Sequence, residues 1–81
     1  MAEVIPFPTV RRRDYVRRQA MRMAELSPAA AEKHLRTQLA VQTKTMARKG
    51  IAPDAIDREL GTLETAIRVL LWRVVLTGDT A

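Results

Sequence analysis

The 81-residue chain contains no cysteine, three glycines, four prolines and only one each of tryptophan, tyrosine and phenylalanine. Without cysteine it can form neither a disulfide nor a thiolate-bound zinc site, so packing or self-association must stabilise it. A chain of this length buries only about 60% of the surface that its unfolded form exposes. The sequence therefore predicts one small domain with a narrow margin of stability.

Residues that could carry out a reaction are also scarce. The single histidine, His34, has no second histidine or cysteine to share a metal ion, which needs three or four ligands. The single serine, Ser27, stands before a proline, where its role is to cap a helix. No glycine-rich loop follows a strand to bind phosphate. We therefore expect a protein that is not an enzyme and has no metal and no cofactor.

Long hydrophobic runs are missing as well. The longest apolar stretch, residues 69–76, is interrupted by Arg73 and is far shorter than the ~20 residues of a membrane span. Near the start, Glu3 and two prolines break up the apolar residues, and arginines follow where a signal peptide is normally cleaved. The sequence predicts a cytoplasmic protein without a membrane segment.

Capping signals divide the chain into three helices. Ser27 followed by Pro28 is a strong helix start, and Gly50 is a typical helix stop. The first helix has Thr9 as its expected N-cap, with Asp14 as the alternative. The expected helices cover residues 9–25, 28–49 and 53–76.

The third helix carries the strongest periodic signal. Its apolar residues are spaced four, three, four, three, four, which is a heptad seam: Ile56, Leu60, Leu63, Ile67, Leu70 and Val74. A short link joins this helix to the second, so we expect an antiparallel hairpin with the first helix packed across it. Gly61, inside the third helix, is expected to allow a close approach of the second. The predicted fold class is all-α, with an extended arm (1–8), a three-helix domain (9–77) and a short tail (78–81).

A second apolar stripe lies nearly opposite this seam and consists of Val69, Trp72 and Leu76. A surface helix of a simple bundle is apolar on one side only. Three explanations are open: the first helix or the arm covers the stripe, two copies form a homodimer through it, or a different protein binds there with Trp72 as its anchor.

Positive charge is concentrated at the front of the chain, whose net charge is +5. Six arginines fall within twelve residues: Arg11, Arg12, Arg13, Arg17, Arg18 and Arg22. Arginine favours planar anionic groups, so we expect a protein partner with an acidic surface, and nucleic acid as the second choice. Tyr15 could stack on a base, although one aromatic residue is a weak signal for single-strand binding. A merely solvated surface is the remaining alternative.

Prolines 6 and 8 stiffen the arm, which presents Ile5 and Phe7 as further apolar anchors. The candidate partner-binding residues are Ile5, Phe7, Arg11, Arg12, Arg13, Tyr15, Arg17, Arg18, Arg22 and Trp72.

Several short motifs suggest a family: Ile5-Pro6-Phe7-Pro8, Arg11-Arg12-Arg13, Tyr15-Val16-Arg17-Arg18-Gln19-Ala20 and Gly50-Ile51-Ala52-Pro53. With them the chain resembles short alphaproteobacterial proteins, common in rhizobia and their mobile elements, that form a domain of unknown function. It is also similar to the QseM-type antiactivators of rhizobial integrative and conjugative elements. The resemblance implies a protein that binds a DNA-binding transcriptional activator and blocks it, so that element transfer stays off. It brings no catalytic residues.

Overall fold

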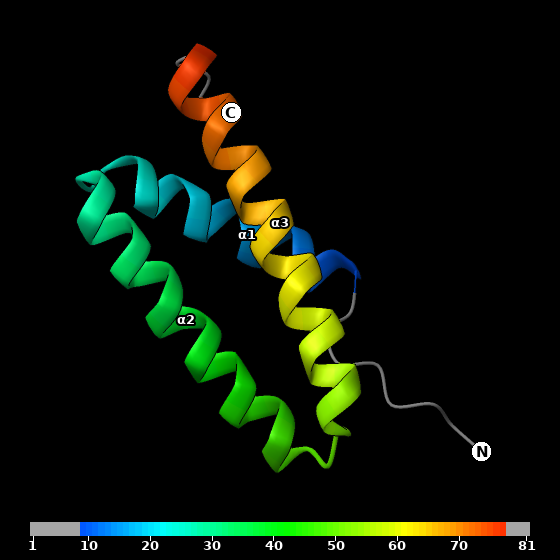
Figure 1. Cartoon of the computed structure of the whole chain (residues 1–81). Coiled ribbons are helices and arrows are strands. Elements are labelled where there is room, and N and C mark those ends of the chain that lie inside the picture. The colour runs from blue at the N-terminus through cyan, green and yellow to red at the C-terminus, as the bar shows by residue number, and fades with distance from the viewer. Residues whose placement is uncertain (1–8, 78–81) are drawn as a thin grey trace.

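A computed structural model of the chain describes residues 9–77, which form three α-helices and no strand. The helices are α1 (Thr9–Ala24), α2 (Pro28–Arg48) and α3 (Pro53–Thr77). α2 and α3 run antiparallel and diverge away from their connecting turn, and α1 crosses behind the middle of α3 and contacts both (Figure 1). The predicted all-α fold with a helical hairpin is confirmed. The arm and the tail lie outside the described residues.

The start of α2 follows the capping rule. Ser27 has an extended backbone, with φ −63° and ψ 158°, and its Oγ accepts a hydrogen bond from the backbone N–H of Ala30 at 3.3 Å. Pro28 takes the first helical position, where no backbone N–H is needed. The cap satisfies one of the free N–H groups of the first turn, so a purely local signal fixes the corner between α1 and α2.

The end of α2 is closed by a Schellman motif. Gly50 has φ 81°, a left-handed conformation that costs glycine little. Its N–H donates to the carbonyl of Ala47 at 3.0 Å, and the N–H of Ile51 donates to the carbonyl of Met46 at 3.2 Å. Met46 and Ile51 both lie in the core, which is the hydrophobic contact that accompanies this motif. The turn thus directs α3 back along α2.

The core lies between one face of α3 and the two other helices. Within the heptad seam of α3, Leu63 and Ile67 are fully buried, while Leu60 and Leu70 pack at its margins. α1 and α2 contribute the apolar residues that face this seam: Tyr15, Val16, Ala20, Met23, Ala31, Leu35 and Met46. The predicted seam is therefore the face on which the helices pack.

An ion pair joins α1 to α3 at the edge of the core. Glu59 is only 8% exposed, and its two carboxylate oxygens accept hydrogen bonds from Nε and Nη2 of Arg12 at 3.0 and 2.8 Å. A buried carboxylate needs such a partner because desolvation is costly. Arg12, predicted to face a partner protein, is thus engaged within the fold.

Gly61 has a different role from the predicted one. A Cβ atom built on this residue meets nothing within 4 Å, and the residue is exposed. The expectation that Gly61 allows a close approach of α2 is therefore wrong, because α2 packs on the seam side of α3. Gly61 only costs helical stability.

Replacing Gly61 with alanine is expected to raise the free energy of unfolding by about 0.5–1 kcal/mol, because alanine has the higher helix propensity and no neighbour obstructs its methyl group. Gly50→Ala is the contrasting variant, and its left-handed backbone predicts a loss of about 1 kcal/mol. Urea unfolding followed by circular dichroism measures both. A destabilising Gly61→Ala would contradict this packing of α3.

Replacing Arg12 with alanine is expected to lower the free energy of unfolding by about 2 kcal/mol, because the carboxylate of Glu59 stays buried without its partner. Arg11→Ala is the matched control, since Arg11 is exposed and should change the stability by less than about 0.5 kcal/mol. A double variant, Arg12→Ala with Glu59→Leu, should regain part of the loss. Equal effects of the two arginine variants would argue against the ion pair.

Candidate protein-docking surface

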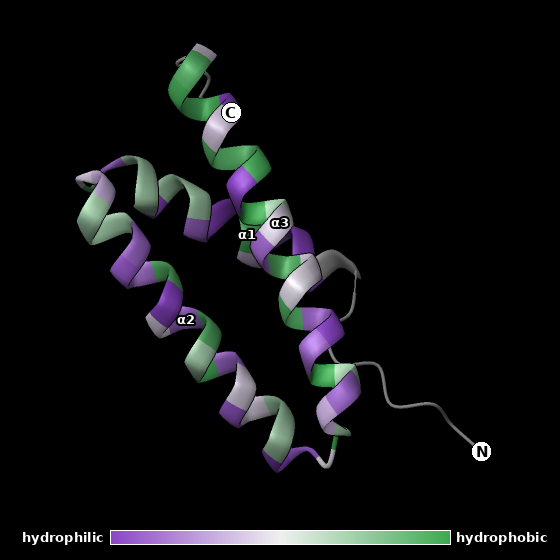
Figure 2. Ribbon diagram, in the orientation of Figure 1, coloured by the Kyte–Doolittle hydropathy of each residue, from purple (hydrophilic) through white to green (hydrophobic). Residues whose placement is uncertain are grey.

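The C-terminal third of α3 exposes large apolar side chains. Trp72 is 68% exposed, Leu76 66%, Val75 62% and Val69 53%. We call these four residues the apolar patch. Figure 2 shows that α3 becomes mainly hydrophobic toward its C-terminal end. An exposed cluster of this kind usually marks an interaction surface.

The exposure of Trp72 bears on the first of the three explanations for the second apolar stripe, which was cover by the first helix or by the arm. Cover by the first helix is wrong, because α1 packs against the seam side of α3, where Arg12 reaches Glu59. A 16-residue helix that crosses a 25-residue helix covers one side of it and leaves the other open. Cover by the arm, with Ile5 and Phe7, lies outside the described residues.

Next to the patch lies a groove of about 750 Å³. Its walls come from the last turn of α1, the first turns of α2 and the C-terminal half of α3; they include Met23, Leu26, Pro28, Ala31, Leu71 and Trp72. Nine of its eleven lining residues are apolar, and the two charged ones are Glu32 and Arg68. Trp72 belongs to both the patch and the groove wall, so the two form one continuous apolar surface.

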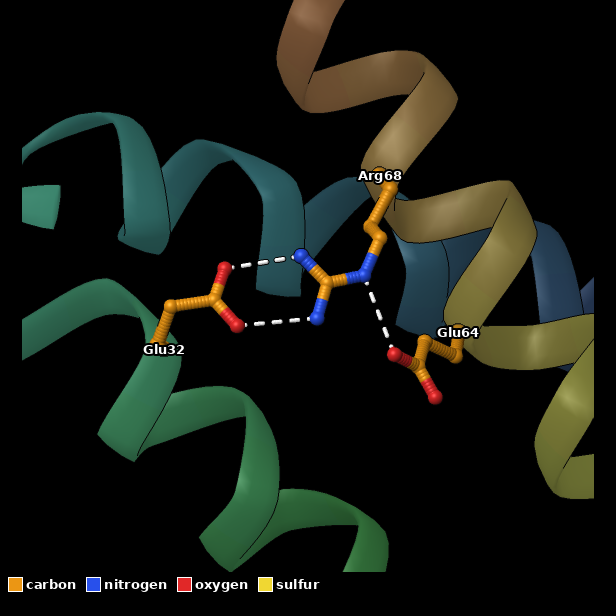
Figure 3. A network of polar contacts seen from close by, with 3 residues as sticks. All are labelled: Glu32, Glu64 and Arg68. Carbon is orange, nitrogen blue, oxygen red and sulfur yellow. Dashed lines mark hydrogen bonds and ion pairs between the residues drawn. The ribbon is translucent and has the colours of Figure 1, made fainter. Parts of the chain in front are cut away.

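The two charged residues of the groove neutralise each other. Nη1 and Nη2 of Arg68 donate to the carboxylate of Glu32 at 2.7 and 2.8 Å, and Nε donates to Glu64 at 3.0 Å (Figure 3). The hydrogen bonds from Arg68 lower the pKa of Glu32, and those to the two carboxylates raise the pKa of Arg68. Each guanidinium nitrogen thus has an acceptor, and the wall leaves a bound molecule few polar groups to satisfy.

The arginine cluster of α1 divides into two groups. Arg12 is held by Glu59, and Arg22 lies 3.8 Å from Glu25 in a loose, exposed pair. The others are exposed and have no ion pair within residues 9–77; they are Arg11, Arg13, Arg17 and Arg18. We call these four the free arginines. Three of them line a second hollow of about 430 Å³ together with Asp14.

Tyr15 does not share the outer surface with the free arginines. It is 5% exposed, and its hydroxyl donates a long hydrogen bond to Gln38 at 3.5 Å. Burial raises its pKa above the ordinary value of 10.0. Tyr15 is therefore a core residue that joins α1 to α2, and its ring is not offered to a nucleotide base or a partner protein. His34 likewise lies at the α1–α2 boundary, with Nε2 2.6 Å from Oε1 of Gln19.

Sequence reasoning found Trp72 but missed the groove beside it. The groove depends on how the corner between α1 and α2 sits against α3, and no spacing in the sequence encodes that placement. Val75 and Leu71 fall outside the stripe at i, i+3 and i+7, although both line the groove. A count of every apolar residue after Ile67 could have indicated them, because the apolar composition rises there.

Residues 9–77 contain neither a helix long and apolar enough to cross a bilayer nor a cluster of three or more potential metal ligands. No curated protein and no solved structure matches the chain. Residues 1–81 do match a protein family, described as a family of unknown function. The chain therefore belongs to the family DUF6074.

Proposed function

We propose that the chain is a regulatory protein–protein interaction module, and more specifically an antiactivator that sequesters a DNA-binding transcriptional activator. The observation that carries the proposal is the uncovered apolar patch, centred on Trp72, beside an apolar groove. Tryptophan is enriched among the residues that dominate binding energy when they are buried in a partner's pocket. Nothing in residues 9–77 buries it.

The apolar surface supplies a large part of the required binding energy. Complete burial of a large apolar side chain contributes roughly 1.5–3 kcal/mol. The four patch residues are each more than half exposed, so their burial contributes several kcal/mol toward the ~8 kcal/mol of a micromolar complex. The apolar patch and groove therefore serve as the desolvated centre of the interface.

The free arginines supply attraction and orientation. They lie on α1, and Met23 and Ala24 at the end of the same helix line the groove. The free arginines and one wall of the groove thus belong to the same helix, and a large partner can contact both. Exposed charges at the rim of an interface mainly accelerate association and select the partner. We infer an acidic surface on the partner next to the segment that enters the groove.

The antiactivator role and its setting in rhizobial mobile elements rest on the resemblance of the N-terminal motifs. In this role the chain works by occlusion: it covers the surface that the activator needs for DNA or for polymerase. No reactive group is required for that mechanism, only affinity. A cytoplasmic location goes with the same proposal.

Nucleic-acid binding is the second candidate, and the free arginines are the observation that favours it. If all four neutralised phosphates, the logarithm of the binding constant would fall with the logarithm of salt concentration at a slope of about −3.6. Base stacking adds nothing here because Tyr15 is buried. Nucleic-acid binding also leaves the apolar patch without a role.

Photo-crosslinking in the host tests the proposal. A benzophenone amino acid in place of Trp72 is expected to crosslink to a DNA-binding activator, because this side chain enters the interface. The same substitution at Val41, exposed by 47% on α2 and outside the groove, is the matched control and should not give that adduct. Purified chain should also remove that activator from its promoter DNA in a mobility-shift assay.

Two results would contradict the proposal. One is equal crosslinking from positions 72 and 41, which would mean that the patch has no special role. The other is a mobility shift of DNA by the isolated chain with the steep salt dependence given above, which would favour the second candidate.

A further inference from the structure

The shape and chemistry of the groove determine what kind of segment it accepts. An extended peptide would leave its backbone N–H and C=O groups unpaired among apolar side chains, because residues 9–77 contain no strand edge to pair with them. A helix brings these groups already bonded. The groove therefore accepts a helix that presents apolar side chains at spacings of three, four and seven residues.

α3 itself is such a helix. Val69, Trp72 and Leu76 stand at i, i+3 and i+7, with Val75 beside them, and all four are more than half exposed. The chain thus carries both the groove and a helix with the apolar spacing described above. Val69, Trp72 and Val75 belong to both.

We infer that a second copy of the chain occupies the groove when no other partner is bound. The contact is a two-fold symmetric, antiparallel crossing of two α3 helices, with Trp72 near the axis. In such a contact the same surface is used on both copies, so patch and groove of each are buried at once. The inference rests on the proposed function in one respect: the activator must compete with this dimer for the same surface.

The pairing of residues across the two-fold axis brings no two like charges of α3 together. A two-fold axis at Trp72 places Val69 opposite Val75 of the other copy, and Arg68 opposite Leu76. By the same rule Arg73 faces Leu71, so no arginine of α3 faces an arginine. Arg68 is moreover neutralised within its own copy by Glu32 and Glu64. The pairing therefore places no like charges directly opposite each other.

The surface area that this crossing can bury is of the order that a weak dimer needs, which is roughly 500 Å² per copy. The exposed part of Trp72 contributes about 150 Å² of this. The other patch residues and the groove wall supply the remainder. Each copy carries a net charge of +5, so general repulsion opposes the dimer and salt relieves it. The dimer should therefore become tighter as salt concentration rises.

Sedimentation equilibrium of the purified full chain over a concentration series, at low and high salt, tests the inference. We expect the mass to rise from 9.1 kDa toward twice that value, at lower concentration in high salt, with a blue shift of the Trp72 emission. Trp72→Asp should weaken the dimer about thirtyfold or more, as for a central interface residue. Val41→Asp is the matched control and should dimerise like the unaltered chain. Circular dichroism verifies that both variants fold.

A monomer at every concentration, or equal dimerisation by Trp72→Asp and Val41→Asp, would overturn the inference. These outcomes are distinguishable from a failure of the proposed function. A monomeric chain that still crosslinks to an activator through position 72 refutes only the dimer. A dimer that dissociates on Trp72→Asp, in a chain that never crosslinks to an activator, supports the dimer and refutes the proposed function.

Discussion

Packing of the seam of α3 against α1 and α2 is the contact on which the rest of the structure depends. Both shorter helices bury their apolar residues against this face, with Leu63 and Ile67 fully enclosed. Residues 9–77 contain no fourth helix that could cover the other face. Because α1 and α2 both pack on the seam side of α3, the four residues of the apolar patch stay more than half exposed. The apolar patch is thus a direct consequence of how the core is built.

Features with a local cause were predictable from the sequence. The cap at Ser27, the stop at Gly50 and the heptad seam each depend on residues a few positions apart, and all three occur as predicted. Features that depend on the relative placement of helices were not predictable. The bond from Arg12 to Glu59 spans 47 residues, and the open space around Gly61 depends on which side of α3 the second helix takes. For the same reason the sequence did not predict whether Trp72 is exposed, because its exposure depends on where α1 and α2 lie relative to α3.

The arginines, like the apolar residues, fall into two groups: some stabilise the fold and others are exposed. Arg12 and Arg68 hold carboxylates of neighbouring helices and so belong to the fold. The free arginines form no ion pair with a carboxylate in residues 9–77. Exposed ion pairs contribute little to stability, so the lack of such pairs costs the fold little. A cationic surface and an apolar groove that share one helix suit a partner that is acidic and amphipathic. This combination connects the basic composition of the chain with a regulatory role that needs no catalysis.

The central claim is that Trp72 belongs to an interface and not to the core of the single chain. The most direct measurement is the free energy of unfolding of Trp72→Ala in dilute solution, beside Leu63→Ala as the reference for a buried residue. The account predicts a change within about 0.5 kcal/mol for Trp72→Ala and a loss of about 2–5 kcal/mol for Leu63→Ala. A loss of about 3 kcal/mol or more for Trp72→Ala would contradict it, because the tryptophan would then be buried within its own chain.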